Sequence, residues 1–135
     1  MIFAVLSAIF DYMDSDTTIQ ELKDFLLKFR EERDWTKFHN PKDLAIAASV
    51  EMGEFLEKFI WKDKAEVILK LKEDLQYRKE VGDELVDVII YCLQFANTTG
   101  IDVSEAFYRK MGENAAKYPV EKVKGRAEKY SSYQH

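Results

Sequence analysis

Two pairs of acidic residues in this chain of 135 residues have the spacing that brings carboxylates together on a helix. Glu51 and Glu54 stand three positions apart, and so do Glu84 and Asp87. Residues three apart lie on the same face of an α-helix, about one turn from each other. Four carboxylates converging from two helices would suit a hard cation such as Mg²⁺ or Mn²⁺, and Mg²⁺ is a frequent partner of phosphate substrates.

The segments that carry these acids are otherwise strongly apolar. At about 100° per residue, the polar positions of residues 81–96, Tyr91 among them, fall within a stripe roughly 100° wide. A charged group on such a helix is costly unless it is paired or binds a metal. Glu51, Glu54 and Lys58 can equally be drawn as the solvated side of an amphipathic helix, so periodicity alone leaves both interpretations open.

Other kinds of site lack the residues they need. A di-iron carboxylate centre requires two Glu-x-x-His motifs, yet Thr36 and Ser132 stand three positions before the two histidines, His39 and His135. The sequence has no glycine-rich phosphate loop and no Gly-x-Ser-x-Gly motif. A single cysteine, Cys92, can form neither an intrachain disulfide nor a zinc cluster, which favours a reducing cytoplasm as the location.

The composition and net charge of the chain indicate which classes of partner it does not bind. The 25 acidic residues outnumber the 20 basic ones, for a net charge of -5, and this balance predicts no nucleic-acid partner. The apolar run at residues 1–10 is about half of the roughly 20 residues needed to span a bilayer, so we expect no membrane partner. We expect residues 1–17 to be an apolar arm or an over-long start rather than a signal peptide.

The remaining pattern is helical and predicts an all-α fold. Apolar residues recur at steps of three and four, and glycine and proline are few. The cap signals predict helices over residues 18–33, 43–61, 65–96 and 102–117, the third formed by two apolar stretches that merge. Four helices with short connections predict a bundle-like protomer, with a helical domain at 18–119 and a polar tail at 120–135.

The third helix also predicts self-association. It is apolar around most of its circumference, and a chain of 135 residues has too few other helices to cover it. We therefore expect a dimer or a tetramer.

Taken in order, these motifs resemble the MazG-like all-alpha nucleoside triphosphate pyrophosphatases, with the greatest likeness to the dCTP pyrophosphatase branch. The resemblance covers about residues 18–130 and rests on Glu51-x-x-Glu54, Glu84-x-x-Asp87 and Lys117-Tyr118-Pro119, with residues 31–41 before them. It implies a helical protomer that assembles through its central helices. It also implies Mg²⁺-dependent cleavage of a nucleoside triphosphate to the monophosphate and pyrophosphate, with Mn²⁺ as a possible substitute.

The resemblance assigns roles to ten residues. It places the metal on Glu51, Glu54, Glu84 and Asp87. The base and sugar would be surrounded by Trp35, Trp61 and Tyr91, and the phosphates would lie near Asn114, Lys117 and Tyr118. In the mechanism we expect, Glu54 takes the proton from the attacking water and Lys117 contacts phosphate oxygens. Packing is an open alternative for Trp61 and Tyr118.

The expected substrate is dCTP or a related pyrimidine deoxynucleoside triphosphate, with a role in nucleotide-pool sanitation. The first helix has Leu26 where some dCTP-selective members offer a histidine toward the base. Two alternatives stay open at this point. One is an enzyme like phosphoribosyl-ATP pyrophosphohydrolase, and the other is a helical interaction module without catalysis.

Overall fold

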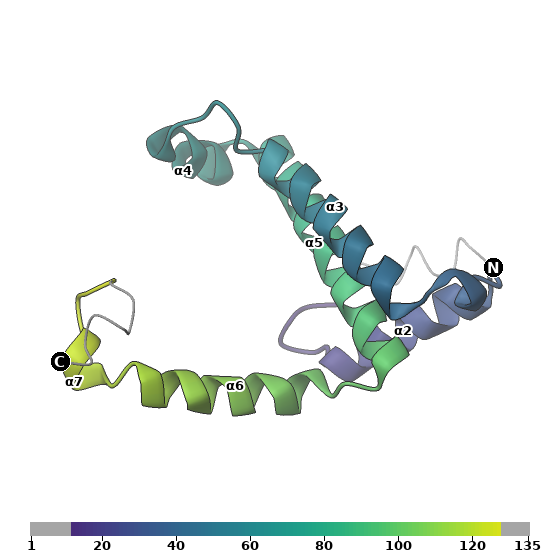
Figure 1. Ribbon diagram of the computed structural model, residues 1–135. Helices are drawn as coiled ribbons and strands as arrows, with labels where there is room; N and C mark the ends of the chain where they lie inside the picture. The colour runs from purple at the N-terminus through teal and green to yellow at the C-terminus, as the bar shows by residue number, and fades with distance from the viewer. Residues whose placement is uncertain (1–11, 128–135) are drawn as a thin grey trace. The chain divides into compact units, whose positions relative to one another are not determined.

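The all-α prediction is confirmed by a computed structural model, which describes residues 12–127. Those residues form six α-helices and a short 3₁₀ helix, η2, with no strand (Figure 1). The elements are α2 (Ile19–Glu31), η2 (Thr36–Phe38), α3 (Pro41–Glu57), α4 (Lys64–Glu73), α5 (Leu75–Thr99), α6 (Val103–Lys117) and α7 (Val120–Val123). Most of the predicted N-terminal arm, residues 1–11, lies outside this range. No helix in the described range is long and apolar enough to cross a bilayer.

Side-chain caps set the helix boundaries, as their residue types predict. The Thr18 hydroxyl accepts from the Glu21 amide at 3.2 Å, and the Thr18 amide donates to the Glu21 carboxylate at 2.7 Å, which completes a capping box. Asn40 caps α3 ahead of a proline at its first position. Gly100 ends α5 with a φ of 72°, in the left-handed region where glycine carries no steric penalty.

The predicted single helix over 65–96 is wrong: the structure has two helices there. The chain leaves helical geometry at Asp74, whose backbone is extended with a φ of -100° and a ψ of 97°. The Asp74 carboxylate accepts from the Tyr77 amide at 2.9 Å, so it starts α5 directly after α4 ends. The short helix α7 was also not predicted and lies within the expected polar tail.

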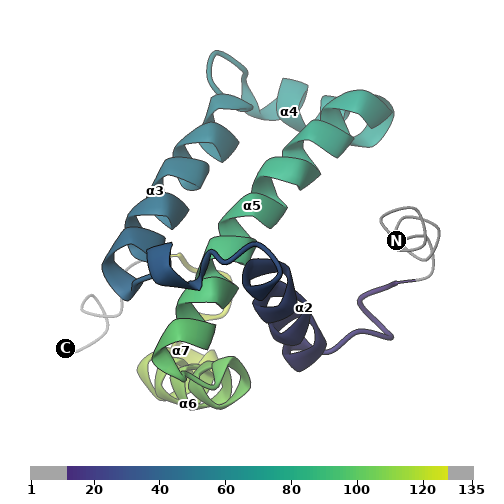
Figure 2. The ribbon, with the colours of Figure 1, turned by 90° about the vertical axis from the view of Figure 1, so that its right-hand side faces the viewer.

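The chain divides into two compact units, and the first ends at Gly100. Within it, α5 is the central helix: α3 runs alongside it, α2 packs near its C-terminal half and α4 near its start (Figures 1 and 2). The buried apolar side chains are those of Leu26, Leu44, Tyr77, Val81, Val88, Leu93 and Ala96. Five of these seven residues belong to α5, so this helix organises the core of the unit.

Side-chain amides of α5 fix the position of α2. The Gln94 amide donates to the carbonyl of Leu26 at 3.2 Å, and the Asn97 amide donates to the carbonyl of Lys23 at 2.9 Å. Gln94 is buried, so this hydrogen bond satisfies its amide nitrogen, which would otherwise be costly in the core. These contacts hold the helix that precedes the Trp35 segment.

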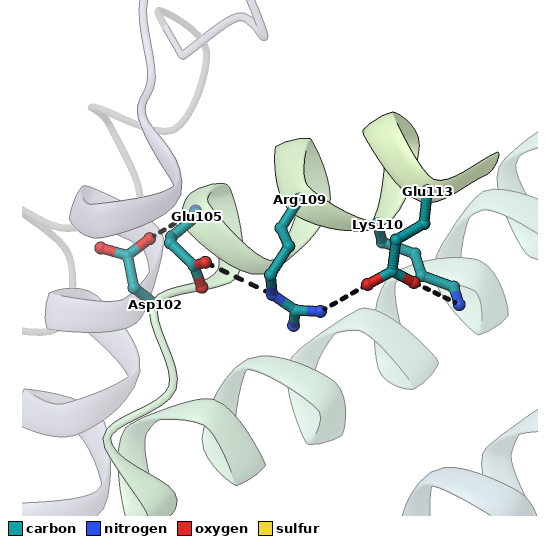
Figure 3. Close-up of polar contacts among 5 residues, drawn as sticks. All are labelled: Asp102, Glu105, Arg109, Lys110 and Glu113. Carbon is teal, nitrogen blue, oxygen red and sulfur yellow. Dashed lines mark hydrogen bonds and ion pairs between the residues drawn. The ribbon is translucent and has the colours of Figure 1, made fainter. Parts of the chain in front are cut away.

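The second unit begins at Ile101 and contains α6 and α7. Asp102 caps α6 by accepting from the Glu105 amide at 2.9 Å. Arg109 then pairs with Glu105 at 3.4 Å and Glu113 at 3.2 Å, and Lys110 also reaches Glu113 at 3.2 Å (Figure 3). Each exposed pair of this kind contributes little by itself because water and salt screen it, but together the pairs support the helix locally.

Candidate metal and substrate site

Three of the four predicted acidic residues meet in the first unit. Glu51 and Glu54 lie on α3, and Glu84 lies on α5. Each offers a carboxylate oxygen, and these oxygens all lie within 4.8 Å of one another. We call Glu51, Glu54 and Glu84 the acidic cluster.

The packing of α3 along α5 explains why Glu84 reaches the cluster. Val81 and Val88 are buried and stand three residues before and four residues after Glu84. Residues at these spacings share one face of a helix, so Glu84 lies on the side of α5 that is covered. Its side chain is 19% exposed, whereas Glu54 is the exposed member of the cluster.

Asp87 lies outside the group defined by that distance but acts on it electrostatically. It is exposed on α5, one turn after Glu84. Its negative charge is among the causes that raise the pKa of Glu51. Asp87 is therefore near enough to influence the cluster, and its role as a metal ligand stays a prediction.

The acidic cluster carries unfavourable charge when it holds only carboxylates. Burial raises the pKa of Glu51 above its ordinary value, and the charges of Glu54, Asp87 and Glu84 raise this pKa further. A bound divalent cation would remove this repulsion. Oxygen donors alone at such short separation are the ligand set that Mg²⁺ or Mn²⁺ takes, so the residues fit a hard cation.

Replacing Glu51 by glutamine is expected to raise the melting temperature in EDTA at neutral pH. The raised pKa means that the Glu51 carboxylate is less favourable in the folded chain than in the unfolded one, and a neutral isostere removes this cost. The cost is present above the raised pKa and disappears as the pH falls below the ordinary value. Thermal unfolding of wild type and Glu51→Gln should therefore differ at neutral pH and converge in acid.

The same variant is expected to lose most of the stabilisation that millimolar Mg²⁺ gives to the wild type, since it lacks a ligand. Glu73→Gln is the matched control, because Glu73 is exposed at the end of α4 and the substitution changes the charge equally. A Glu51→Gln protein that melts below wild type in EDTA would contradict the electrostatic assignment.

Lys58 belongs to the surroundings of the cluster, although its sequence position suggested a solvated side chain. Its Nζ lies 3.0 Å from Glu84 Oε1. The hydrogen bond with Glu84 is the main cause that raises the pKa of Lys58, and the charges of Glu80 and Glu57 add to it. The only sequence signal for Lys58 was its spacing of four residues from Glu54, which does not show that it reaches α5.

The two predicted tryptophans flank α3 in sequence and are accessible. Trp35 is exposed, and its ring forms an edge-to-face pair with the ring of Phe29, with 6.0 Å between the ring centroids. Trp61 is 99% exposed, so it does not pack in the core of the described residues. Its φ of 63° is unusual for a bulky residue, and Asp34, just before Trp35, is the other non-glycine residue in the described range with positive φ.

Tyr91 lies on α5, seven residues after Glu84, and is half-buried. Seven residues are about two helical turns, so Tyr91 and Glu84 share a face of α5. The sequence stripe that joined Tyr91 to the acids is thus carried by a continuous helix in the structure. Its contact with a nucleotide stays a prediction.

Asn114, Lys117 and Tyr118 lie at the C-terminal end of α6, in the second unit. The Tyr118 amide donates to the carbonyl of Asn114 at 2.9 Å, which closes the last turn of the helix. The acidic cluster, by contrast, belongs to the first unit. The role of these three residues in phosphate binding therefore stays a prediction.

Comparison with known proteins supports one family. The sequence model of the MazG-like family matches residues 46–132. The chain is 33% identical to dCTP pyrophosphatase 1 of Bos taurus over 121 residues, which cover 90% of this chain and 71% of that protein. It is 34% identical to dCTP pyrophosphatase 1 of Rattus norvegicus over 116 residues, which cover 86% of this chain and 68% of that protein.

A solved structure gives the same result for the fold. The crystal structure of a pyrophosphatase from Archaeoglobus fulgidus DSM 4304 superposes with a TM-score of 0.69 at 37% sequence identity. The match covers 81% of this chain and 99% of that one. Both the sequence and the fold thus point to the relatives that the acidic motifs suggested.

Proposed function

The chain belongs to the MazG-like family and is a nucleoside triphosphate pyrophosphatase, and we propose that it uses Mg²⁺ to cleave dCTP or a related pyrimidine deoxynucleoside triphosphate. The products are the nucleoside monophosphate and pyrophosphate. The observation that carries the proposal is the acidic cluster, in which carboxylate oxygens from α3 and α5 lie within 4.8 Å of one another.

The acidic residues have two tasks in this reaction. Glu51, Glu54, Glu84 and Asp87 would hold the metal, and a bound cation would supply positive charge to neutralise the charge that develops on the triphosphate oxygens. Glu54 is the exposed member of the acidic cluster, so it can face a water molecule that enters from solvent. It accepts the proton of that water as the water oxygen bonds to phosphorus and pyrophosphate leaves. No covalent intermediate with the protein is needed.

The other predicted residues orient the nucleotide. Trp35, Trp61 and Tyr91 offer flat surfaces for the base and sugar, and the full exposure of Trp61 leaves both faces of its ring available. Lys117 steadies the phosphate oxygens as a point charge, with Asn114 three positions before it and Tyr118 directly after it. The size of the pocket and hydrogen bonds to the edge of the base would then supply the preference for pyrimidines.

We also propose that the enzyme works as a dimer or tetramer in a reducing cytoplasm. The support for self-association is an apolar strip on α5, formed by Leu85, Val86 and Ile89, which are 45%, 50% and 41% exposed. An exposed apolar strip on the central helix of a unit is costly in water unless another chain covers it.

A cytoplasmic location agrees with a single, free Cys92.

The substrate assignment is tested by comparing kcat/KM for dCTP, dTTP, dUTP, dATP, dGTP and CTP in the presence of Mg²⁺. We expect the pyrimidine deoxynucleotides to be preferred, with dCTP first. Phosphoribosyl-ATP belongs in the same panel because its hydrolases were the alternative enzyme class. A preference for purines would contradict the proposed base, and a preference for phosphoribosyl-ATP would contradict the proposed substrate class.

A further inference from the structure

Lys58 makes an ion pair that differs from the others in the described part of the chain. Its Nζ is 3.0 Å from Glu84 Oε1, and the two side chains are 27% and 19% exposed. The remaining ion pairs there join residues no more than four positions apart. The pair of Lys58 and Glu84 instead joins the residue that caps the C-terminus of α3 to α5, and both of its side chains are less exposed than those of the other pairs. A pair with restricted access to water is screened less than a surface pair.

Lys58 is also held in place through its backbone. The hydroxyl of Tyr77 donates to the Lys58 carbonyl at 2.7 Å, and Tyr77 is buried on α5. Glu84 lies seven residues further along the same helix. The residue that caps the C-terminus of α3 is therefore attached to α5 at two points, one through the Lys58 carbonyl and one through its ammonium group. This arrangement keeps a positive charge beside the acidic cluster.

Glu84 has two roles that conflict. It contributes an oxygen to the acidic cluster, and one of its oxygens is already the partner of Lys58. A carboxylate that binds an ammonium group offers less negative charge to a metal, and the ammonium also repels any divalent cation that approaches. We propose that Lys58 is a built-in counter-ion that competes with the divalent cation for Glu84 and weakens metal binding to the acidic cluster. This inference rests on the metal site of the proposed function.

In this role Lys58 is a positioning residue rather than a catalytic one. Without metal it offsets the mutual repulsion of the acids and keeps Glu84 in the orientation that the cluster requires. With metal it must give up part of its contact with Glu84. The affinity of the free protein for a divalent cation should then rise when the charge of Lys58 is removed.

The test is calorimetric titration of the full chain with Mn²⁺ alone, without nucleotide, after removal of bound metal by EDTA. Lys58→Met keeps most of the aliphatic stem and removes the charge, and we expect its Kd for Mn²⁺ to fall about tenfold, the effect of one nearby charge. Lys58→Arg keeps the charge and should stay within about twofold of wild type. Lys79→Met is the matched control, because Lys79 makes an exposed ion pair with Asp83 on α5, outside the acidic cluster.

A second measurement, which also needs no turnover, compares how strongly the metal stabilises the folded state. The rise in melting temperature caused by Mg²⁺ should be larger for Lys58→Met than for wild type. If the methionine variant does not stay folded in EDTA, Lys58→Gln is measured in its place. Wild type that binds Mn²⁺ while the uncharged variants bind no more tightly would overturn the role of Lys58 alone. Wild type that binds no Mn²⁺ would overturn the metal site itself, and this inference with it.

Discussion

Replacing Glu54 by glutamine or Asp87 by asparagine is expected to reduce kcat for nucleotide hydrolysis by about 100-fold or more. Each substitution keeps the shape of the side chain and removes its charge. Loss of an outer-shell partner of a metal typically costs about 10–100-fold, and loss of a direct ligand should cost at least as much. Glu54 has a further role as acceptor of the proton from water, so its variant should be the weaker enzyme.

The fold of both variants should persist, because Glu54 and Asp87 are exposed and neither belongs to the buried core. Circular dichroism and thermal unfolding in EDTA check this directly. Asp83→Asn is the matched control: Asp83 is an exposed acid of α5 that pairs with Lys79, and its variant should keep wild-type activity. Full activity in both Glu54→Gln and Asp87→Asn would refute the assignment of these acids to the metal.

Replacing Val86 by arginine is expected to weaken self-association by about 100-fold, the effect of placing a charge at the centre of an apolar interface. Val86 is half exposed in the strip on α5. At about 100° per residue it lies roughly opposite Glu84 on the helix, so the substitution leaves the acidic cluster unaltered. Sedimentation at micromolar concentration should show a dimer or tetramer for wild type and mainly monomer for the variant.

Gln76→Arg is the control for charge and helix propensity. Gln76 is exposed on α5 as well, but helical geometry places it well away from the apolar strip. This variant should sediment as wild type does. Wild type that is a monomer at micromolar concentration would rule out the proposed assembly.

The helices could be predicted where the chain carries its own start and stop signals. Thr18, Asn40 and Gly100 act locally, since each satisfies backbone groups within one turn. The break at Asp74 was missed because apolar residues continue on both sides of it, and neither glycine nor proline interrupts the pattern. An aspartate can start a helix or lie on the surface of one, and the residue type alone does not distinguish the two cases.

The candidate site was also predictable only where it depends on local sequence. The spacing of Glu51 and Glu54 follows from one helix, but their approach to Glu84 depends on how far α3 is shifted along α5. That shift is set by packing between residues distant in sequence, which spacing does not encode. The resemblance to a family supplied the pairing of the two motifs. Lys58 was not found in this way because its contact with Glu84 crosses between helices.

Analysis of the phosphate products from dCTP tests the central claim most directly. The reaction is followed by ³¹P NMR with Mg²⁺ and, in parallel, with EDTA. If the acidic cluster supports cleavage between the α and β phosphates, dCMP and pyrophosphate should form in equal amounts with Mg²⁺, and neither should form with EDTA. Orthophosphate and dCDP as the first products, or equal rates with and without the metal, would contradict the account.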